Sequence, residues 1–130
     1  MRAILLLRGD TLDIYTLETE PESNEIKNIL TNPENQYLGI INNFIIIIRH
    51  IASQGLNLSK AYFDCWRESG IYFCELKKDK HRISFFQYQN RLLLMTYFIK
   101  HQAIEPREYR RAIRLKRSFD ENPIWEEDNG

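Results

Sequence analysis

The chain has 130 residues, of which 43% are hydrophobic and 28% are charged, and its formal net charge is zero. This length predicts one compact domain whose core needs neither disulfides nor a metal, and the composition is ordinary for a globular protein. The most apolar stretch, residues 38–48, contains Asn42 and Asn43 and is too short to cross a bilayer. Residues 1–7 lack the basic region and the cleavage site of a secretory signal, so we expect a cytoplasmic domain without a membrane partner.

The N-terminal half predicts two short strands followed by two helices. Residues 3–7 and 12–17 are aliphatic and β-branched, and the Arg8-Gly9-Asp10 sequence between them indicates a turn. Residues 22–30 begin with acidic side chains and favour a short helix. A better-defined helix follows and is expected to end at Gly55, because its apolar side chains recur at helical spacing: Tyr37, Leu38, Ile41, Phe44, Ile45, Ile48 and Ile51.

The two cysteines, Cys65 and Cys74, do not lie at the spacing of a metal-binding pair. A cytosolic environment keeps thiols reduced, so we expect two free thiols here in preference to a disulfide or a metal site. The sequence also contains no glycine-rich phosphate loop, no paired carboxylate site and no Ser/His/Asp order. We therefore expect neither a metal nor a cofactor.

The C-terminal half predicts an antiparallel meander and a final helix. Residues 71–77, 82–88 and 91–100 are rich in Ile, Phe, Tyr and Leu, and the short connections between them suit hairpins. Pro106 suits the first turn of a helix, because its missing N–H has no partner there in any case. We expect this helix to run to about Phe119.

These elements together predict an α+β fold. The sheet is expected to be antiparallel and to consist of the three-stranded meander plus an N-terminal strand or hairpin. Two N-terminal helices would pack on this sheet, and a C-terminal helix would complete the fold. We expect one domain over residues 1–119 and an acidic C-terminal tail over residues 120–130.

The zero net charge conceals a strong polarisation along the chain. Residues 77–117 carry twelve Lys and Arg side chains against three acidic ones, a net charge of +9, whereas residues 1–76 carry −4 and residues 118–130 carry −5. Such asymmetry predicts a polyanionic partner, and RNA is the one we favour. The alternative is a solvated surface whose charges the acidic tail balances in space. The side chains expected to bind RNA are Lys78, Lys80, His81, Arg91, Arg107, Arg110, Arg111 and Arg114.

Four side chains at the ends of the predicted strands could carry a reaction: Lys77, Arg82, Lys100 and His101. RNA supplies its own nucleophile, the 2′-hydroxyl, so its cleavage needs only a base, an acid and cations that stabilise the phosphate. Arginine grips phosphate oxygens in two places, and histidine titrates near neutral pH. This set therefore suits cleavage of RNA without a metal or a small-molecule cofactor.

Three segments together resemble the phage-derived, HigB-like branch of the RelE/ParE toxin superfamily. They are GIYFCELK at residues 70–77, HRISFF at residues 81–86, and FIKH at residues 98–101, followed by Pro106 and later Ala112. That branch shows a Glu-Leu-Arg strand, a Tyr-Arg-Ile strand, and Phe-x-Lys-Lys before a proline that opens a helix. The resemblance covers roughly residues 70–116.

The resemblance implies a RelE-like fold and a type II toxin that cleaves mRNA, usually on the ribosome, and is silenced by an antitoxin. Lys77 would take the place of the arginine in Glu-Leu-Arg, Arg82 that of the arginine in Tyr-Arg-Ile, and Lys100 that of the first lysine. Two residues depart from the pattern, since His101 replaces the second lysine and His81 replaces the aromatic residue. Glu75 is expected to orient Lys77 or Arg82 through an ion pair.

Three functions stay open at this point. The first is a metal-independent mRNA endonuclease, or mRNA interferase, in which Arg82 and Lys100 bind phosphate and His101 shuttles protons. The second is a ParE-like inhibitor of a protein target such as DNA gyrase, acting through the helix after Pro106. The third is a catalytically inactive binding protein of the RelE fold, which the missing second lysine would explain.

Overall fold

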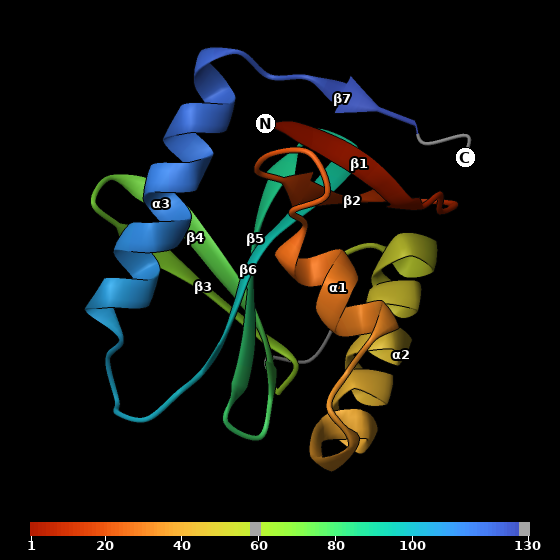
Figure 1. Cartoon of the computed structure of the whole chain (residues 1–130), viewed down its shortest axis with the longest axis vertical. Helices are drawn as coiled ribbons and strands as arrows, with labels where there is room; N and C mark the ends of the chain where they lie inside the picture. Colours follow the sequence, from red (N-terminus) through yellow and green to blue (C-terminus); the bar gives the residue numbers. More distant parts are fainter. Residues whose placement is uncertain (58–60, 128–130) are drawn as a thin grey trace.

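The computed structural model describes residues 1–57 and 61–127, and Figure 1 shows how its elements are arranged. A seven-stranded sheet forms the centre, with the strand order β3-β4-β5-β6-β2-β1-β7. The strands are β1 (Arg2–Leu7), β2 (Asp13–Glu18), β3 (Phe63–Glu68), β4 (Ile71–Lys78), β5 (His81–Tyr88), β6 (Arg91–Ile99) and β7 (Trp125–Glu126). The helices are α1 (Glu25–Thr31), the 3₁₀ helix η1 (Asn35–Tyr37), α2 (Leu38–Gln54) and α3 (Pro106–Glu121). None of these helices, within the described ranges, has the length and apolar character that a membrane span requires.

The sheet consists of two antiparallel parts that are joined by one parallel pairing. Strands β3 to β6 form an antiparallel meander, and β1 and β2 form an antiparallel hairpin. Strand β2 pairs in parallel with β6, where Asp13 lies opposite Arg91 and Thr16 lies opposite Leu94. Strand β7 pairs in parallel with β1 at one edge of the sheet. Segments from both ends of the chain therefore share one sheet.

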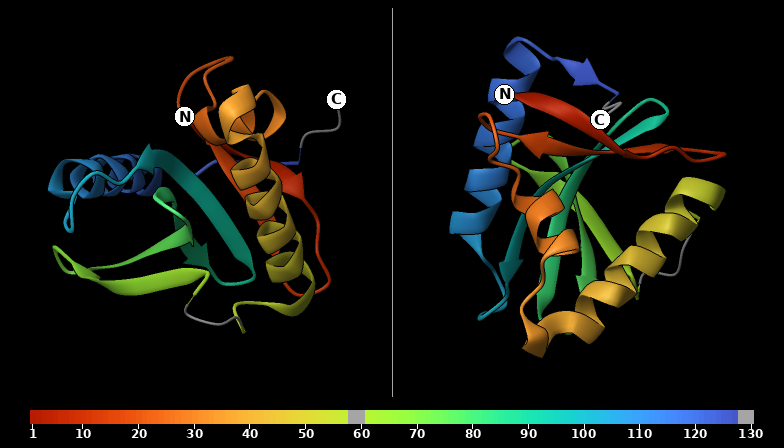
Figure 2. Two further views of the ribbon diagram at one scale, coloured as in Figure 1. Left: turned by 90° about the horizontal axis from the view of Figure 1, so that it is seen from below. Right: turned by 45° about the vertical axis from the view of Figure 1, so that its right-hand side comes forward.

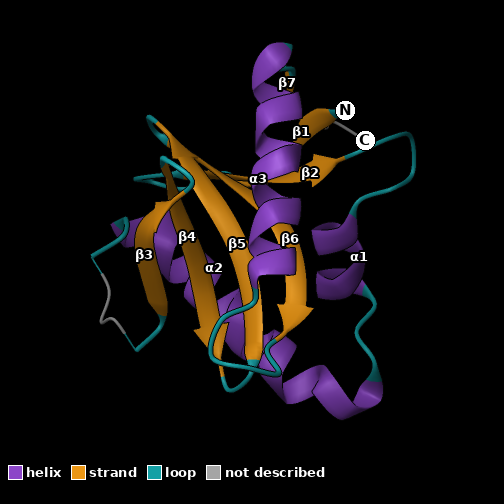
Figure 3. Ribbon diagram, turned by 90° about the vertical axis from the view of Figure 1, so that its left-hand side faces the viewer, coloured by secondary structure: helices purple, strands orange, loops and turns teal. Residues whose placement is uncertain are grey.

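Each face of the sheet has its own hydrophobic core, because successive side chains of a strand point to opposite faces. Helices α1 and α2 cover one face, where Phe44 and Ile51 pack in the same cluster as Phe85. Helix α3 covers the other face, where Tyr109 and Phe119 belong to the second cluster. Figure 2 shows α2 and α3 on opposite sides of the sheet, and in Figure 3 α3 crosses in front of β5 and β6.

The predicted fold class is wrong. The sheet is mixed and has seven strands, whereas we expected an antiparallel sheet of a three-stranded meander plus an N-terminal strand or hairpin. One reason is that residues 63–68 mix charged and apolar side chains, so β3 was not predicted. A second reason is that the pattern of a strand indicates which side chains share a face but not which strand lies beside it. The three α-helices also cover both faces of this sheet.

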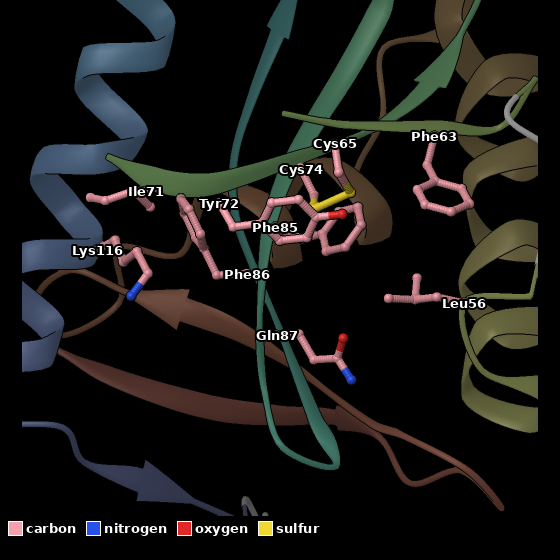
Figure 4. A pocket seen from close by; sticks show the side chains of 10 residues that line it. All are labelled: Leu56, Phe63, Cys65, Ile71, Tyr72, Cys74, Phe85, Phe86, Gln87 and Lys116. Atoms are coloured by element: carbon pink, nitrogen blue, oxygen red, sulfur yellow. A yellow bond between two sulfur atoms is a disulfide. The ribbon is translucent and has the colours of Figure 1, made fainter. Parts of the chain in front are cut away.

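The expectation of two reduced thiols is also wrong, because Cys65 and Cys74 form a disulfide. The pairing of β3 with β4 places the two residues directly opposite each other, with their Cα atoms 4.1 Å apart. Figure 4 shows the bond in a pocket that Leu56, Phe63 and Phe85 also line. The disulfide fastens β3, which lies at the edge of the described sheet, to the neighbouring strand β4.

Candidate functional site

Three of the four predicted catalytic side chains gather around Glu75 on the face of the sheet that α3 covers. Lys77 and Arg82 lie opposite each other in the pairing of β4 with β5. Arg82 also lies opposite Phe98 of β6, so Lys100, two residues further along, falls on the same face. The positive charges of all three side chains act on the Glu75 carboxyl group. We call Lys77, Arg82 and Lys100, together with Glu75, the cation cluster.

Glu75 is the buried centre of the cation cluster, with 2% of its surface exposed. Its Oε1 lies 3.4 Å from Nε of Arg82, an ion pair in which no hydrogen bond forms. Its Oε2 has no hydrogen-bond partner among the residues that the structure describes. Burial raises the pKa of the Glu75 carboxyl group, and the charges of Arg82, Lys100 and Lys77 oppose this rise. Because burial dominates, Glu75 keeps its proton to a higher pH than an ordinary glutamate does.

The turn between β4 and β5 fixes the guanidinium group of Arg82. Nη1 of Arg82 donates to the carbonyl oxygens of Asp79, at 2.7 Å, and of His81, at 2.9 Å. Asp79 adopts the left-handed backbone conformation, with φ at 52°, which aspartate tolerates better than most residues. Only 12% of the Arg82 side chain is exposed. A segment predicted merely as a connection therefore also positions a residue of the candidate site.

Lys77 forms an ion pair with Asp64, whose Oδ2 lies 2.8 Å from the lysine Nζ. Asp64 belongs to β3, where it lies opposite Glu75 in the strand register. We did not predict a role for Asp64, because we did not predict β3. The alternation of apolar and polar side chains in Phe63-Asp64-Cys65 is the signal that could have indicated it.

The fourth predicted catalytic residue, His101, lies on the loop that follows β6. It is exposed, and its backbone N–H donates to Oε1 of Glu105 at 2.6 Å. The backbone N–H of Gln102 donates to the same oxygen at 3.0 Å. The bond from His101 and the bonds from Gln102 hold the pKa of the Glu105 carboxyl group below its usual value. The backbone N–H of Lys100 bonds to the carbonyl oxygen of Lys80 at 2.7 Å, which fixes the end of β6 beside the β4–β5 turn.

An aromatic wall borders the cation cluster on the side of α3. The Tyr109 ring lies edge-on to Trp66 of β3, with 5.3 Å between the ring centroids, and its centroid lies 5.2 Å from that of Phe73. Burial raises the pKa of the Tyr109 hydroxyl, and the nearby Glu75 carboxylate raises it further. Tyr109 was predicted only as part of the apolar side of its helix, since nothing in the sequence indicates which strands that side covers.

Three of the predicted RNA-binding residues lie at or beside the β4–β5 turn. Lys78 is the last residue of β4, and Lys80 is exposed in the turn. His81 lies on the opposite face of the sheet from Arg82 and is only 4% exposed. Its Nδ1 shares a hydrogen bond with the Tyr97 hydroxyl, and burial lowers the pKa of its ring. Lys80 therefore faces solvent and Lys78 is half-buried, whereas the histidine belongs to the packed interior.

The other predicted RNA-binding residues lie at the start of β6 and on α3. The guanidinium carbon of Arg91 lies 4.7 Å from the centre of a Trp125 ring. Arg111 is held between two carboxylates, with Nη1 2.8 Å from Oε1 of Glu25 and Nε 3.0 Å from Oε1 of Glu108. The remaining residues of the predicted set are exposed on α3: Arg107, Arg110 and Arg114.

Comparison with known proteins adds no assignment to this geometry. The chain matches no model of a known protein family. It also matches none of the curated proteins. Within residues 1–57 and 61–127, no three or more His, Cys, Asp or Glu side chains gather in a way that could hold a metal ion. What the cation cluster can do follows from the chemistry of its own side chains.

Proposed function

We propose that this protein is a metal-independent endoribonuclease that cleaves mRNA on the ribosome, as the toxin of a type II toxin–antitoxin pair. The observation that carries the proposal is the cation cluster, in which β4, β5 and the residue directly after β6 each contribute a positive side chain around one buried carboxyl group. Fixed positive charges of this kind bind a phosphodiester and stabilise the negative charge that develops as it is cleaved. The resemblance of residues 70–116 to the HigB-like toxins supports the same function.

Arg82 and Lys100 are the phosphate-binding residues in this proposal. The guanidinium of Arg82 is held by two carbonyl oxygens and by Glu75, so its orientation is set before RNA arrives. Lys100 has no ion-pair partner among the described residues, which leaves its charge available to a ligand. Lys77 is paired with Asp64 and adds to the local positive potential. Glu75 acts as a positioning residue for Arg82.

The proposed reaction is an attack of the RNA 2′-hydroxyl on the adjacent phosphorus. The bond from phosphorus to the 5′ oxygen breaks, and the products carry a 2′,3′-cyclic phosphate and a 5′-hydroxyl. His101 takes the proton from the 2′-hydroxyl and returns it to the leaving 5′ oxygen, so no net proton is consumed. The exposure of His101 and its place directly after Lys100 support this role.

The proposal implies a cytoplasmic protein that meets mRNA on translating ribosomes and is silenced by a cognate antitoxin. The cytoplasm is a reducing compartment, in which a disulfide is readily opened. Cys74 points to the opposite face of β4 from Glu75, because adjacent residues of a strand alternate. Either redox state of the Cys65–Cys74 pair is therefore compatible with the cation cluster.

Cleavage of mRNA on translating ribosomes tests this proposal. The parent protein is expected to cut mRNA on translating ribosomes and to leave a 2′,3′-cyclic phosphate end, measured by primer extension and end-group analysis. Lys100→Ala should lower the cleavage rate by about 100-fold, because it removes a charge that stabilises the transition state. Arg82→Lys keeps a positive charge but loses the guanidinium group that the turn and Glu75 orient, so we expect a smaller loss, about tenfold.

Arg49→Ala is the matched control, since Arg49 is exposed on α2, on the other side of the sheet, and its loss should leave the rate unchanged. Thermal unfolding verifies that each variant is folded. If Lys100→Ala cleaves as fast as the parent, the cation cluster is not the active site. If the parent binds RNA without cutting it, the chain is a binding protein. Intact RNA together with damaged DNA in cells that express the chain would favour the ParE-like alternative.

A further inference from the structure

The acidic C-terminal segment does not neutralise the basic face of α3. Glu126 pairs with Arg2, and Glu127 lies 2.5 Å from Nη2 of Arg8, so both glutamates bind the region of β1. Asp120 pairs within α3 itself, with its Oδ2 2.6 Å from Nζ of Lys116. These acidic side chains therefore leave most of the arginines of α3 uncompensated.

Four arginines of α3 are exposed and have no ion-pair partner among the residues that the structure describes: Arg107, Arg110, Arg114 and Arg117. The last three recur at spacings of four and three residues, so they lie on one side of the helix. Seven residues of an α-helix rise by about 10 Å, so three guanidinium groups are distributed along that length.

These three arginines line a groove of about 470 Å³ between α3 and the turn that joins β3 to β4. Figure 1 shows this turn beside α3. Ser69 and Gly70 both have left-handed backbone conformations, with φ at 52° and 79°, so two residues are enough to reverse the chain. The turn brings Ser69 to one wall of the groove, and Ser118 of α3 adds a second hydroxyl-bearing residue.

The lining of this groove fits the backbone of a nucleic acid better than a protein surface. Guanidinium groups hold phosphate oxygens in two places, and serine hydroxyls are common donors to phosphate. A protein partner usually needs aromatic or aliphatic anchors in a dry centre. Among the residues that the structure describes, no aromatic side chain lines this groove, and its apolar residue, Ile113, is only 4% exposed. Binding here would therefore depend on charge.

Tyr109 and Arg110 of α3 link the groove to the cation cluster. Arg110 directly follows Tyr109, whose ring packs against Trp66 and whose hydroxyl lies close enough to Glu75 to respond to its charge. Helix α3 then runs along β5, because its Lys116 lies 4.9 Å from the centre of the Tyr88 ring at the far end of that strand. A polynucleotide held at the cluster could continue along the arginine side of α3 to Glu121, at the end of the groove.

We propose that this arginine groove binds the sugar–phosphate backbone of RNA next to the cleaved nucleotide, which rests on the proposed endoribonuclease function. Its residues are Ser69, Arg110, Arg114, Arg117 and Ser118. The groove contacts phosphates and not bases, so it contributes affinity and orientation without sequence preference. Arg111, although predicted to bind RNA, lies outside it because Glu25 and Glu108 hold its side chain.

Binding of a fluorescently labelled RNA duplex to the full chain, measured by anisotropy over a range of KCl concentrations, tests this proposal. In the variant with Arg110→Ala, Arg114→Ala and Arg117→Ala, affinity should fall. The slope of log K against log salt should become less steep by about 2 to 3, because each neutralised phosphate contributes about 0.9. Alanine suits exposed helix positions, so the fold should be retained.

A matched pair of single variants separates the groove from the general effect of charge. Arg114→Ala and Arg49→Ala remove the same charge from exposed positions of α3 and α2, on opposite sides of the sheet. We expect about a tenfold loss of affinity for Arg114→Ala, as for loss of one charged hydrogen-bonding group, and no loss for Arg49→Ala. Equal losses in the two variants would overturn the proposal.

Two further probes decide what the groove binds, and one variant separates this proposal from the cleavage reaction. A DNA duplex of the same sequence should bind comparably because the groove contacts phosphates, and a DNA duplex that does not bind would overturn the assignment to the phosphate backbone. A polyglutamate probe that binds more tightly than RNA at the same salt would identify an acidic polypeptide as the partner instead. Lys100→Ala should retain duplex binding, so a chain that binds through the groove but cuts no RNA would overturn the proposed function alone.

Discussion

The buried carboxyl group of Glu75 makes the stability of the protein depend on pH in an unusual direction. Burial raises its pKa, so the folded chain binds this proton more tightly than the unfolded chain does. The carboxyl group therefore makes its full contribution to the free energy of unfolding below the ordinary glutamate pKa of about 4.3. This contribution is lost as the pH rises through the raised pKa of the folded state. Each pH unit by which the pKa is raised corresponds to about 1.4 kcal/mol.

Glu75→Gln should remove this pH dependence, because glutamine has a similar shape and does not ionise. We expect the variant to gain stability relative to the parent as the pH rises from 5 to 8. The measurement is urea unfolding of both proteins at several pH values. The difference in the free energy of unfolding between the two proteins does not contain the contributions of other groups. One such group is His81, whose lowered pKa makes stability change with pH in the opposite direction. A difference that stays constant over this range would contradict the expected role of burial.

At the scale of residues, the sequence predicts the cation cluster only in part. Strand alternation correctly groups Lys77 and Arg82, since it depends only on positions within two neighbouring strands. It does not reveal Asp64, because that residue reaches the cluster through a strand that was not predicted. Nor does it reveal that Tyr109 lies close to Glu75, because the contact depends on how α3 crosses the sheet.

At the scale of elements, the Cys65–Cys74 disulfide holds β3 at the edge of the sheet. In the chain-entropy model, closing a loop of this length stabilises the fold by about 2–3 kcal/mol. Reduction with dithiothreitol should therefore lower the free energy of unfolding by about that amount, measured by urea denaturation. Without reductant, the double variant Cys65→Ala, Cys74→Ala should be as unstable as the reduced parent. Adding dithiothreitol to this variant should not change its stability further. Unchanged stability of the parent on reduction would contradict this expectation.

The boundaries of several elements could be predicted because local signals determine them. The predicted start of the last helix at Pro106 agrees with the first residue of α3, where proline is well suited. The expected end of the long helix at Gly55 agrees with a C-cap glycine at φ 80°. Strands β3 and β7 lack such signals. Strand β7 has only two residues, and its formation depends on β1 beside it.

At the scale of the whole molecule, Trp125 fastens the C-terminal segment to the rest of the fold. Its ring centroid lies 4.9 Å from that of Tyr15 and 5.2 Å from those of Tyr88 and Phe119. The strand that carries it pairs with β1. One tryptophan therefore connects the last strand to both the N-terminal hairpin and α3.

Trp125→Ala should lower the free energy of unfolding by about 3 kcal/mol, at the low end for a tryptophan because the ring is only partly buried. The neighbouring change Ile124→Ala is the control, since Ile124 is 40% exposed, and we expect a loss below about 1 kcal/mol. Thermal or urea unfolding measures both. Equal effects of the two substitutions would show that the aromatic contacts do not hold the segment in place.

The order of strands in the sheet could not be predicted from this sequence. The aliphatic and β-branched residues of 12–17 identify a strand, but the same composition would suit several neighbours. The pairing of Asp13 with Arg91 depends on how two hairpins approach each other after each has formed. The expected antiparallel sheet was wrong for this reason, although most of its strands were predicted.

The parallel pairing of β2 with β6 also has a consequence for the order in which the protein folds. Strand β2 is made early by the ribosome, yet its neighbour β6 is made only after α1, α2 and the first three strands of the meander. Contacts between such distant segments carry a large loop-closure entropy and form slowly. The cation cluster needs β4, β5 and the end of β6. A chain that is still being synthesised therefore cannot assemble the cluster until most of its length has left the ribosome.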